Sequence, residues 1–134
     1  SFWNDSKATN FHATLGALRS INRPIVWIGG GRARGGDIEA FAQQVGSLVD
    51  IAILYGEVAE RLAKALRSFL EPVHIHKHLD HAITAAAEFA AKIPQANVLF
   101  SPGFASYDQF DSFVARGKSF NDRVLSLKNA HKPN

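Results

Sequence analysis

Short apolar runs alternate with segments of helical periodicity along the whole chain. After the opening pair Phe2-Trp3, the runs are four or five residues long, which is typical of β-strands that are buried on both faces. Between them, apolar residues recur every three or four positions and indicate helices with one buried stripe. The pattern predicts strands at residues 2–3, 25–28, 51–55, 72–76 and 97–100, and helices at residues 10–20, 38–48, 58–69, 79–93 and 110–127.

Alternation of strand and helix predicts an α/β domain with a mainly parallel sheet, because strand–helix–strand units close with right-handed crossovers. We expect a Rossmann-like, three-layer fold with about six strands and helices on both faces. The 134 residues, 46% of them apolar, predict a single domain over residues 1–134. No linker or repeat interrupts the pattern, and the tail at residues 129–134 is expected to fray.

The chain contains no cysteine, which excludes a disulfide framework and a thiolate metal site. Its formal charge of +3 is small and scattered, unlike the basic stripe of nucleic-acid-binding proteins, and suits a small anionic ligand. No apolar run approaches the roughly 18 residues that cross a bilayer. We therefore expect a cytoplasmic protein with no nucleic-acid partner and no membrane insertion. Methionine is absent even from position 1, so we expect the chain to belong to a longer protein.

The loops expected after the first, second and last strands, residues 5–10, 29–37 and 101–108, are rich in polar residues or glycine. The carboxyl ends of parallel strands meet at one edge of a sheet, where open α/β folds bind ligands. Residues 4–10 offer a carboxylate, an ammonium group, two hydroxyls and two amides, and Asn10 or Thr9 is expected to cap the next helix. This distribution predicts an anion-binding site, although the first loop by itself is equally compatible with a capped turn.

The glycine-rich loop at residues 29–37 contains Arg32 and Arg34 and allows two interpretations. Glycines let backbone N–H groups approach an anion, and arginines bind carboxylate or phosphate in bidentate fashion. A flexible surface loop is the alternative. The dinucleotide fingerprint G-x-G-x-x-G is not matched, because Arg34 stands where its third glycine would be. Asp37 is expected to cap the helix that follows.

The remaining candidate motifs are weaker. The Gly-Lys-Ser of residues 117–119 resembles the end of a phosphate-binding loop, but it lies in a predicted helix and the motif's first glycine is missing. Ser106 has no histidine partner that would activate it as a nucleophile. Four histidines lie on or after the fourth strand without a carboxylate or thiolate that would complete a zinc site, so we interpret them as polar residues of an edge strand. They are His74, His76, His78 and His81.

Residues 4–10, Asn-Asp-Ser-Lys-Ala-Thr-Asn, resemble the N-D-S-K-A-T-N signature of the D-glutamate-adding branch of the Mur ligase family at all seven positions. Residues 101–110 are similar to that branch's S-P-A-x-A-S-x-D-Q-F, and Phe113 and Arg116-Gly117 continue its F-x-x-R-G pattern. The loop at residues 29–37 lies where the family has a glycine pair followed by a basic residue. The resemblance covers the whole chain and is to the C-terminal domain only. The N-terminal UDP-binding and central ATPase domains have no counterpart here.

The resemblance implies a monomeric enzyme of peptidoglycan synthesis in the bacterial cytoplasm. ATP phosphorylates the alanyl carboxylate of UDP-N-acetylmuramoyl-L-alanine, and the amine of D-glutamate attacks the acyl phosphate to form an amide with loss of phosphate. ATP and Mg²⁺ are bound mainly by the central domain, so this domain by itself is expected to be inactive. Its implied part is to bind D-glutamate and close over ATP.

By the same resemblance, Asp5 contacts the ribose of ATP. Lys7 lies near the phosphates and the reacting carboxylate and is the implied catalytic residue. The basic ligand is Arg34, although the glycine-rich loop allows the alignment to shift onto Arg32. The residues implied to hold D-glutamate are Thr9, Arg34, Ser106 and the main chain around Tyr107 and Phe113.

Two alternatives remain, one from another functional class and one a related ligase. A stand-alone module that binds an anion or a nucleotide would carry out no chemistry, and calorimetry on this chain tests it. A sister ligase such as folylpolyglutamate synthetase has a glutamyl-adding domain of similar fold, but the signature at residues 4–10 argues against it.

Overall fold

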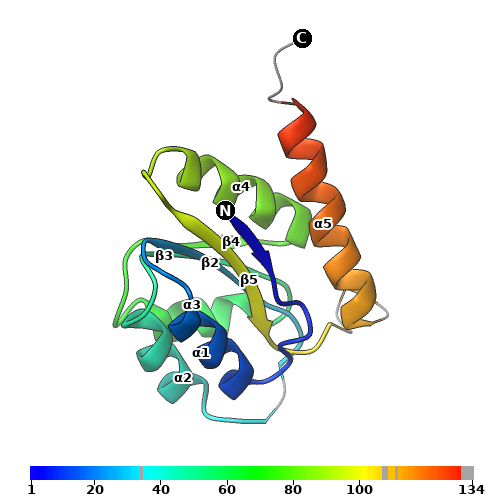
Figure 1. The fold of residues 1–134 in the computed structure, drawn as a ribbon. Coiled ribbons are helices and arrows are strands. Elements are labelled where there is room, and N and C mark those ends of the chain that lie inside the picture. Colours follow the sequence, from blue (N-terminus) through cyan, green and yellow to red (C-terminus); the bar gives the residue numbers. More distant parts are fainter. Residues whose placement is uncertain (34, 107–108, 111, 131–134) are drawn as a thin grey trace.

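The computed structural model describes residues 1–33, 35–106, 109–110 and 112–130. Strand and helix alternate throughout, as the apolar pattern predicts (Figure 1). The strands are β1 (Phe2–Asn4), β2 (Ile25–Gly30), β3 (Ile51–Tyr55), β4 (Val73–His76) and β5 (Asn97–Gly103). The helices are α1 (Phe11–Ser20), α2 (Ile38–Gly46), α3 (Ala59–Leu66), α4 (Leu79–Ala91) and α5 (Phe113–Ala130).

The strands form one parallel sheet in the order β1-β5-β2-β3-β4. β5 therefore lies between β1 and β2, although it is the last strand in the sequence. Helices α1, α2 and α3 pack on one face of the sheet, and α4 and α5 pack on the other (Figure 1). The three-layer α/β fold is confirmed, and its sheet has five strands within the described residues rather than about six.

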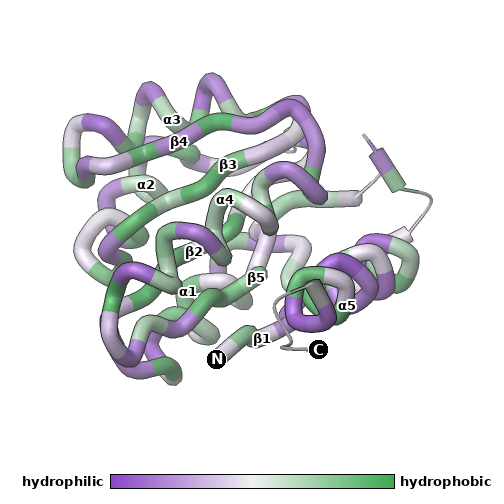
Figure 2. Tube along the Cα trace, turned by 90° about the horizontal axis from the view of Figure 1, so that it is seen from above, coloured by the Kyte–Doolittle hydropathy of each residue, from purple (hydrophilic) through white to green (hydrophobic). Residues whose placement is uncertain are grey.

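The core lies on both sides of the central strands, because successive strand residues point to opposite faces. In β2, Ile25 and Trp27 belong to the cluster under α1–α3, whereas Val26 and Ile28 belong to the cluster under α4 and α5. Figure 2 shows hydrophobic colouring along β2 and β3, while the surface helices alternate between hydrophobic and hydrophilic residues. In the part of the chain that the structure describes, no helix is both long and apolar enough to cross a membrane.

Several element boundaries differ from the sequence prediction by one to three residues, including those of β2, β5 and α5. β2 and β5 extend to Gly30 and Gly103, which pair with each other, so the loops after these strands begin later than predicted. α5 begins at Phe113 and not at Phe110, and the Phe110 N–H instead donates to the Ser106 carbonyl at 2.8 Å in the loop before the helix. At the other end α5 includes residues 129 and 130, where fraying was predicted, and residues 131–134 lie outside the described residues.

Both helix caps expected at the carboxyl edge of the sheet are confirmed. The Asn10 side chain accepts a hydrogen bond from the Ala13 N–H at 2.9 Å, and Asp37 accepts one from the Ala40 N–H at 3.0 Å. Such a cap contributes about 1 kcal/mol to helix stability. The cap of α1 is therefore Asn10 and not Thr9.

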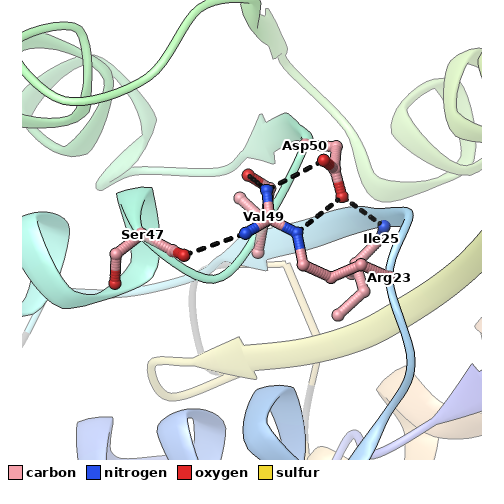
Figure 3. Close-up of polar contacts among 5 residues, drawn as sticks. All are labelled: Arg23, Ile25, Ser47, Val49 and Asp50. Carbon is pink, nitrogen blue, oxygen red and sulfur yellow. Dashed lines mark hydrogen bonds and ion pairs between the residues drawn. The ribbon is translucent and has the colours of Figure 1, made fainter.

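At the opposite edge of the sheet, Asp50 joins the starts of β2 and β3 (Figure 3). Its Oδ2 accepts from the Ile25 N–H at 2.7 Å, and its Oδ1 accepts from Arg23 Nη2 at 2.9 Å. Arg23 also donates to the carbonyls of Ser47 and Val49. Burial by itself raises the pKa of Asp50, but the hydrogen bonds from Arg23 and Ile25 and the charge of Arg23 outweigh it and lower that pKa below its ordinary value.

Asp50→Asn is expected to lower the free energy of unfolding by about 1 kcal/mol at neutral pH, because it removes a paired charge and weakens the acceptor for the Ile25 N–H. Since the folded-state pKa lies below the ordinary 3.8, the contribution of Asp50 is present above that pH and is lost as the pH falls below it. Urea unfolding at pH 7 should show the difference between wild type and variant, and unfolding at about pH 2 should show a smaller one. Equal differences at the two pH values would contradict this role.

Candidate anion-binding site at the carboxyl ends of the strands

The loops after β1, β5 and β2 lie side by side because these strands are neighbours in the sheet. The chain leaves β5 toward the face covered by α5, and it leaves β1 and β2 toward the opposite face (Figure 1). Ligand sites of open α/β sheets form where neighbouring loops diverge in this way. The strands expected to build the site therefore meet at a topological switch point.

Main-chain hydrogen bonds join these loops to one another. The Gly103 N–H at the end of β5 donates to the Ala8 carbonyl in the first loop at 2.9 Å. The Arg32 N–H in the second loop donates to the Ala105 carbonyl at 2.8 Å, within an isolated antiparallel bridge. Main-chain hydrogen bonds therefore hold the three loops relative to one another, independently of any side-chain contact.

The turn after β1 presents Lys7 to solvent. The Asn4 side chain accepts from the Ser6 N–H at 3.1 Å, and the Asp5 carbonyl accepts from the Ala8 N–H at 3.0 Å. Ala8 is buried, so the turn is anchored on one side while the Lys7 side chain is exposed on the other. Within the described residues, the Lys7 ammonium forms no ion pair.

The carboxylate of Asp5 is oriented by β5. Its Oδ2 accepts from Ser101 Oγ at 2.9 Å, and the Asp5 N–H donates to the Phe100 carbonyl at 2.7 Å. Ser101 is itself fully buried: its Oγ lies 3.2 Å from Thr14 Oγ1, and its carbonyl accepts from Trp27 Nε1 at 2.9 Å. Asp5 therefore has a defined position at the sheet edge. The sequence reading missed Ser101 and Thr14, since no local pattern links either residue to Asp5.

The glycines at residues 29–31 are buried packing positions, so this part of the chain is not a flexible surface loop. A Cβ on Gly29 would overlap the Trp27 ring, and a Cβ on Gly30 would overlap the Tyr55 carbonyl. Gly30 and Gly31 have φ angles of +140° and +129°, which residues with side chains rarely adopt. The exposed part of the loop is limited to Arg32 and residues 35–37 among the described positions.

The residues expected to hold D-glutamate are only partly within the described ranges. Ser106 is buried, and Thr9 is half-buried directly before the cap of α1. Phe113 opens α5 with a half-exposed ring, and its carbonyl accepts from Ser6 Oγ at 2.8 Å. Arg34 and Tyr107 lie outside the described residues, so their assigned roles stay predictions.

A buried arginine that sequence reasoning did not single out lies among these loops. Arg116 is 0% exposed and donates from Nη1 to the Phe104 carbonyl and from Nη2 to the Ser6 carbonyl, both at 2.8 Å. Its Nε donates to Ser6 Oγ at 3.2 Å. Arg116 and Ser6 are 110 positions apart, and neither has a local signal that predicts their contact. The only sequence signal for Arg116 is its place in the F-x-x-R-G pattern of the family.

The four histidines lie on or after β4, which is two strands away from β2 in the sheet. β4 is an edge strand, as predicted, and the ring of His74 stacks on Phe89 with a centroid separation of 4.7 Å. Burial, together with the charges of His74 and His81, lowers the pKa of His76. Within the part of the chain that the structure describes, no group of three or more metal-ligating side chains could hold a metal ion.

Solved structures share this architecture. They include Mycobacterium tuberculosis folylpolyglutamate synthase complexed with ADP and AMPPCP, with a TM-score of 0.61 and 18% identity over 87% of this chain and 28% of that one. Another is E. coli FolC in complex with ADP, with a TM-score of 0.59 and 20% identity over 92% of this chain and 28% of that one. At these identities the likeness shows the fold alone.

Residues 1–104 match the family described as Mur ligase, glutamate ligase domain, and the chain therefore belongs to that family. The family resemblance inferred from residues 4–10 and 101–110 is thereby confirmed. Its relatives include the UDP-N-acetylmuramoylalanine–D-glutamate ligases of Rhodopseudomonas palustris (strain HaA2) and Thermosynechococcus vestitus, at 42% and 39% identity over 94% and 92% of this chain. The chain spans only 27% and 28% of the length of these two relatives.

Proposed function

We propose that this chain is the C-terminal domain of an ATP-dependent ligase that adds D-glutamate to UDP-N-acetylmuramoyl-L-alanine in peptidoglycan synthesis. The observation that carries the proposal is the turn at residues 4–10, which lies at the carboxyl edge of the sheet beside the loops after β5 and β2. We assign the UDP-sugar site, the ATPase machinery and Mg²⁺ to the rest of a monomeric ligase in the bacterial cytoplasm. This domain by itself is then inactive.

In the proposed reaction, the alanyl carboxylate attacks the γ-phosphorus of ATP and ADP leaves. The amine of D-glutamate then attacks the acyl phosphate, and the tetrahedral intermediate loses phosphate to leave the amide. Both steps concentrate negative charge on the oxygens of the transferred and acyl groups. The exposed ammonium of Lys7 is suited to neutralise this charge, because no ion pair within the described residues competes for it.

The placement of Asp5 supports its assignment to the ribose of ATP. Ser101 Oγ donates a hydrogen bond to Oδ2 of Asp5, so Oδ1 is left to accept hydrogen bonds from the ribose hydroxyls. Because Asp5 is also bound through its N–H to β5, the carboxylate is oriented before the nucleotide arrives. This assignment makes Asp5 a binding residue and leaves charge stabilisation to Lys7.

D-glutamate requires donors for two carboxylates. Thr9 lies at the N-terminus of α1, where free N–H groups and the helix dipole favour an anion. Ser106 lies in the loop after β5, and the Phe113 carbonyl at the start of α5 already accepts a hydrogen bond from Ser6 of the first loop. We assign the basic ligand to Arg34. Arg32 is the alternative, because its main chain bridges to Ala105, the residue directly before Ser106.

Thr9→Val in the full-length ligase is expected to raise the KM for D-glutamate about tenfold, since it removes one hydrogen bond to a charged ligand and keeps the shape of the side chain. The KM for ATP should be unchanged, because Asp5 and Lys7 are untouched. Phosphate release with each substrate varied in turn measures both values. A parallel rise in the KM for ATP would contradict the assignment of Thr9 to D-glutamate.

Calorimetry on the 134-residue chain separates the proposal from the stand-alone alternative. Tight binding of a nucleotide, without any D-glutamate-dependent phosphate release by the full-length protein, would favour an anion- or nucleotide-binding module. Weak binding by the isolated chain, combined with D-glutamate-dependent phosphate release by the full-length protein, supports the ligase.

A further inference from the structure

A fully buried guanidinium occupies the junction of the three loops that form the candidate site. Arg116 projects from the first turn of α5 and donates to Phe104 in the loop after β5 and to Ser6 in the loop after β1. The loop after β2 reaches the same point at Gly31, where an added Cβ would lie 3.2 Å from Arg116 Nη1. One side chain is therefore hydrogen-bonded to two of the loops and lies against the third.

The same junction docks the start of α5 on the turn after β1. Ser6 Oγ donates to the Phe113 carbonyl at 2.8 Å, and Asn4 Nδ2 donates to the Gly117 carbonyl at 2.9 Å. A Cβ on Gly117 would lie 3.2 Å from the Ser6 Cβ, so the helix and the turn are in close contact. These contacts and the Arg116–Ser6 hydrogen bonds together fix the position of Phe113 relative to the Lys7 turn.

Arginine is the side chain that this junction requires. Its acceptors are two carbonyls and one hydroxyl that lie in different directions, and within the described residues all of its partners are neutral. A buried charge is tolerated when its donors are satisfied, and the planar guanidinium offers five donors in a fixed fork. Lysine carries its donors on one atom and cannot reach all three acceptors in the same geometry.

The two halves of the candidate site have different anchors. Asp5 is held by Phe100 and Ser101 of β5, and these contacts do not involve Arg116. Ser106, in contrast, follows Phe104 by two residues, and Phe113 precedes Arg116 by three. We propose that Arg116 is a positioning residue that holds the amino-acid side of the site, Ser106 and Phe113, in register with the turn that carries Lys7 and Thr9. This inference rests on the proposed function.

Arg116→Lys in the full-length ligase is expected to raise the KM for D-glutamate about 10- to 100-fold, because small misplacements of positioning groups have effects of that size. The KM for ATP should change by less than about twofold, since the anchors of Asp5 are intact. Arg123→Lys is the matched control: Arg123 lies on the same helix but donates to Thr84 of α4, so both KM values should stay at the wild-type level. Equal rises of the two KM values in Arg116→Lys, or no rise, would overturn the inference.

Amide hydrogen exchange on the ligand-free chain tests the positioning role without any activity. Exchange in residues 104–106 and 113–116 should become about tenfold faster in Arg116→Lys, while the Asp5 amide keeps its wild-type rate. Unchanged exchange in those segments would show that Arg116 does not hold the loops. If the wild-type ligase shows no D-glutamate-dependent phosphate release, that result would instead contradict the proposed function and the link of Arg116 to D-glutamate binding.

A milder substitution, Ser6→Ala, tests the same inference if Arg116→Lys does not fold. Ser6→Ala removes only the hydroxyl between Arg116 Nε and the Phe113 carbonyl. It is expected to raise the KM for D-glutamate several-fold and to leave the KM for ATP unchanged. An unchanged KM for D-glutamate in Ser6→Ala would count against the inference.

Discussion

Lys7→Met in the full-length ligase is expected to lower kcat about 100- to 1,000-fold, the range found when one preorganised group that stabilises transition-state charge is removed. The KM for D-glutamate should stay near the wild-type value, because Thr9 and Ser106 are intact. We expect this loss of kcat because the turn leaves the Lys7 side chain exposed. The turn is closed by the hydrogen bond from the Ala8 N–H to the Asp5 carbonyl and by the one from the Ser6 N–H to the Asn4 side chain. Lys7→Arg keeps the charge and should retain part of the activity.

The measurement for Lys7 is ATP-dependent phosphate release at saturating D-glutamate, with thermal unfolding as a check on the fold. Lys64→Met is the matched control, because Lys64 is an exposed lysine on α3. This helix connects β3 to β4, at the other end of the sheet from β1. It should have wild-type kcat. A Lys7→Met enzyme with wild-type kcat would remove Lys7 from the reaction and leave the turn as a structural cap.

Gly30→Ala is expected to destabilise the chain by about 3 kcal/mol or more, a large part of the 5–15 kcal/mol of a typical domain. Gly30 has a φ of +140°, and its Cβ would overlap the backbone carbonyl of Tyr55 in the neighbouring strand. That carbonyl also accepts the Gly31 N–H at 3.3 Å, so β2 and β3 would have to separate where the candidate site begins. Backbone atoms on a paired strand cannot move aside as a flexible side chain can.

Urea unfolding followed by tryptophan fluorescence measures this loss, since Trp27 is fully buried. Gly16→Ala provides the control: Gly16 lies on an exposed position of α1 with no atom within 4 Å of an added Cβ. That variant should stabilise the chain by about 0.5–1 kcal/mol, because alanine has the higher helix propensity. Similar effects of the two substitutions would refute the packing role of Gly30.

The alternation of strand and helix could be predicted from the sequence because it rests on local periodicity. Ile51–Tyr55 was predicted with both bounds correct, and the caps Asn10 and Asp37 follow from residue types that compete for free helix N–H groups. Boundaries beside glycine were less predictable. β2 continues through Gly30 and β5 through Gly103 because strand pairing satisfies their backbone, although glycine is usually found in loops.

The family and the first loop of the candidate site could also be predicted, because the signature at residues 4–10 is contiguous. The sequence placed Asp5, Lys7 and Thr9 on one turn, and it predicted that the loops after the first, second and last strands would meet. What it could not supply was the strand order that places β5 between β1 and β2. That order depends on which strands pair through space, and apolar periodicity is the same for every buried strand.

The sequence alone therefore determined the order of the elements, the cap of α2 and the family signature, because each depends on residues that are close together in the chain. Only the tertiary structure decided that Gly30 is a packing position, that Ser101 orients Asp5 and that Arg116 joins the three loops. These contacts join residues 12 to 110 positions apart. They form only after the sheet has brought its carboxyl ends together, and no local pattern records them.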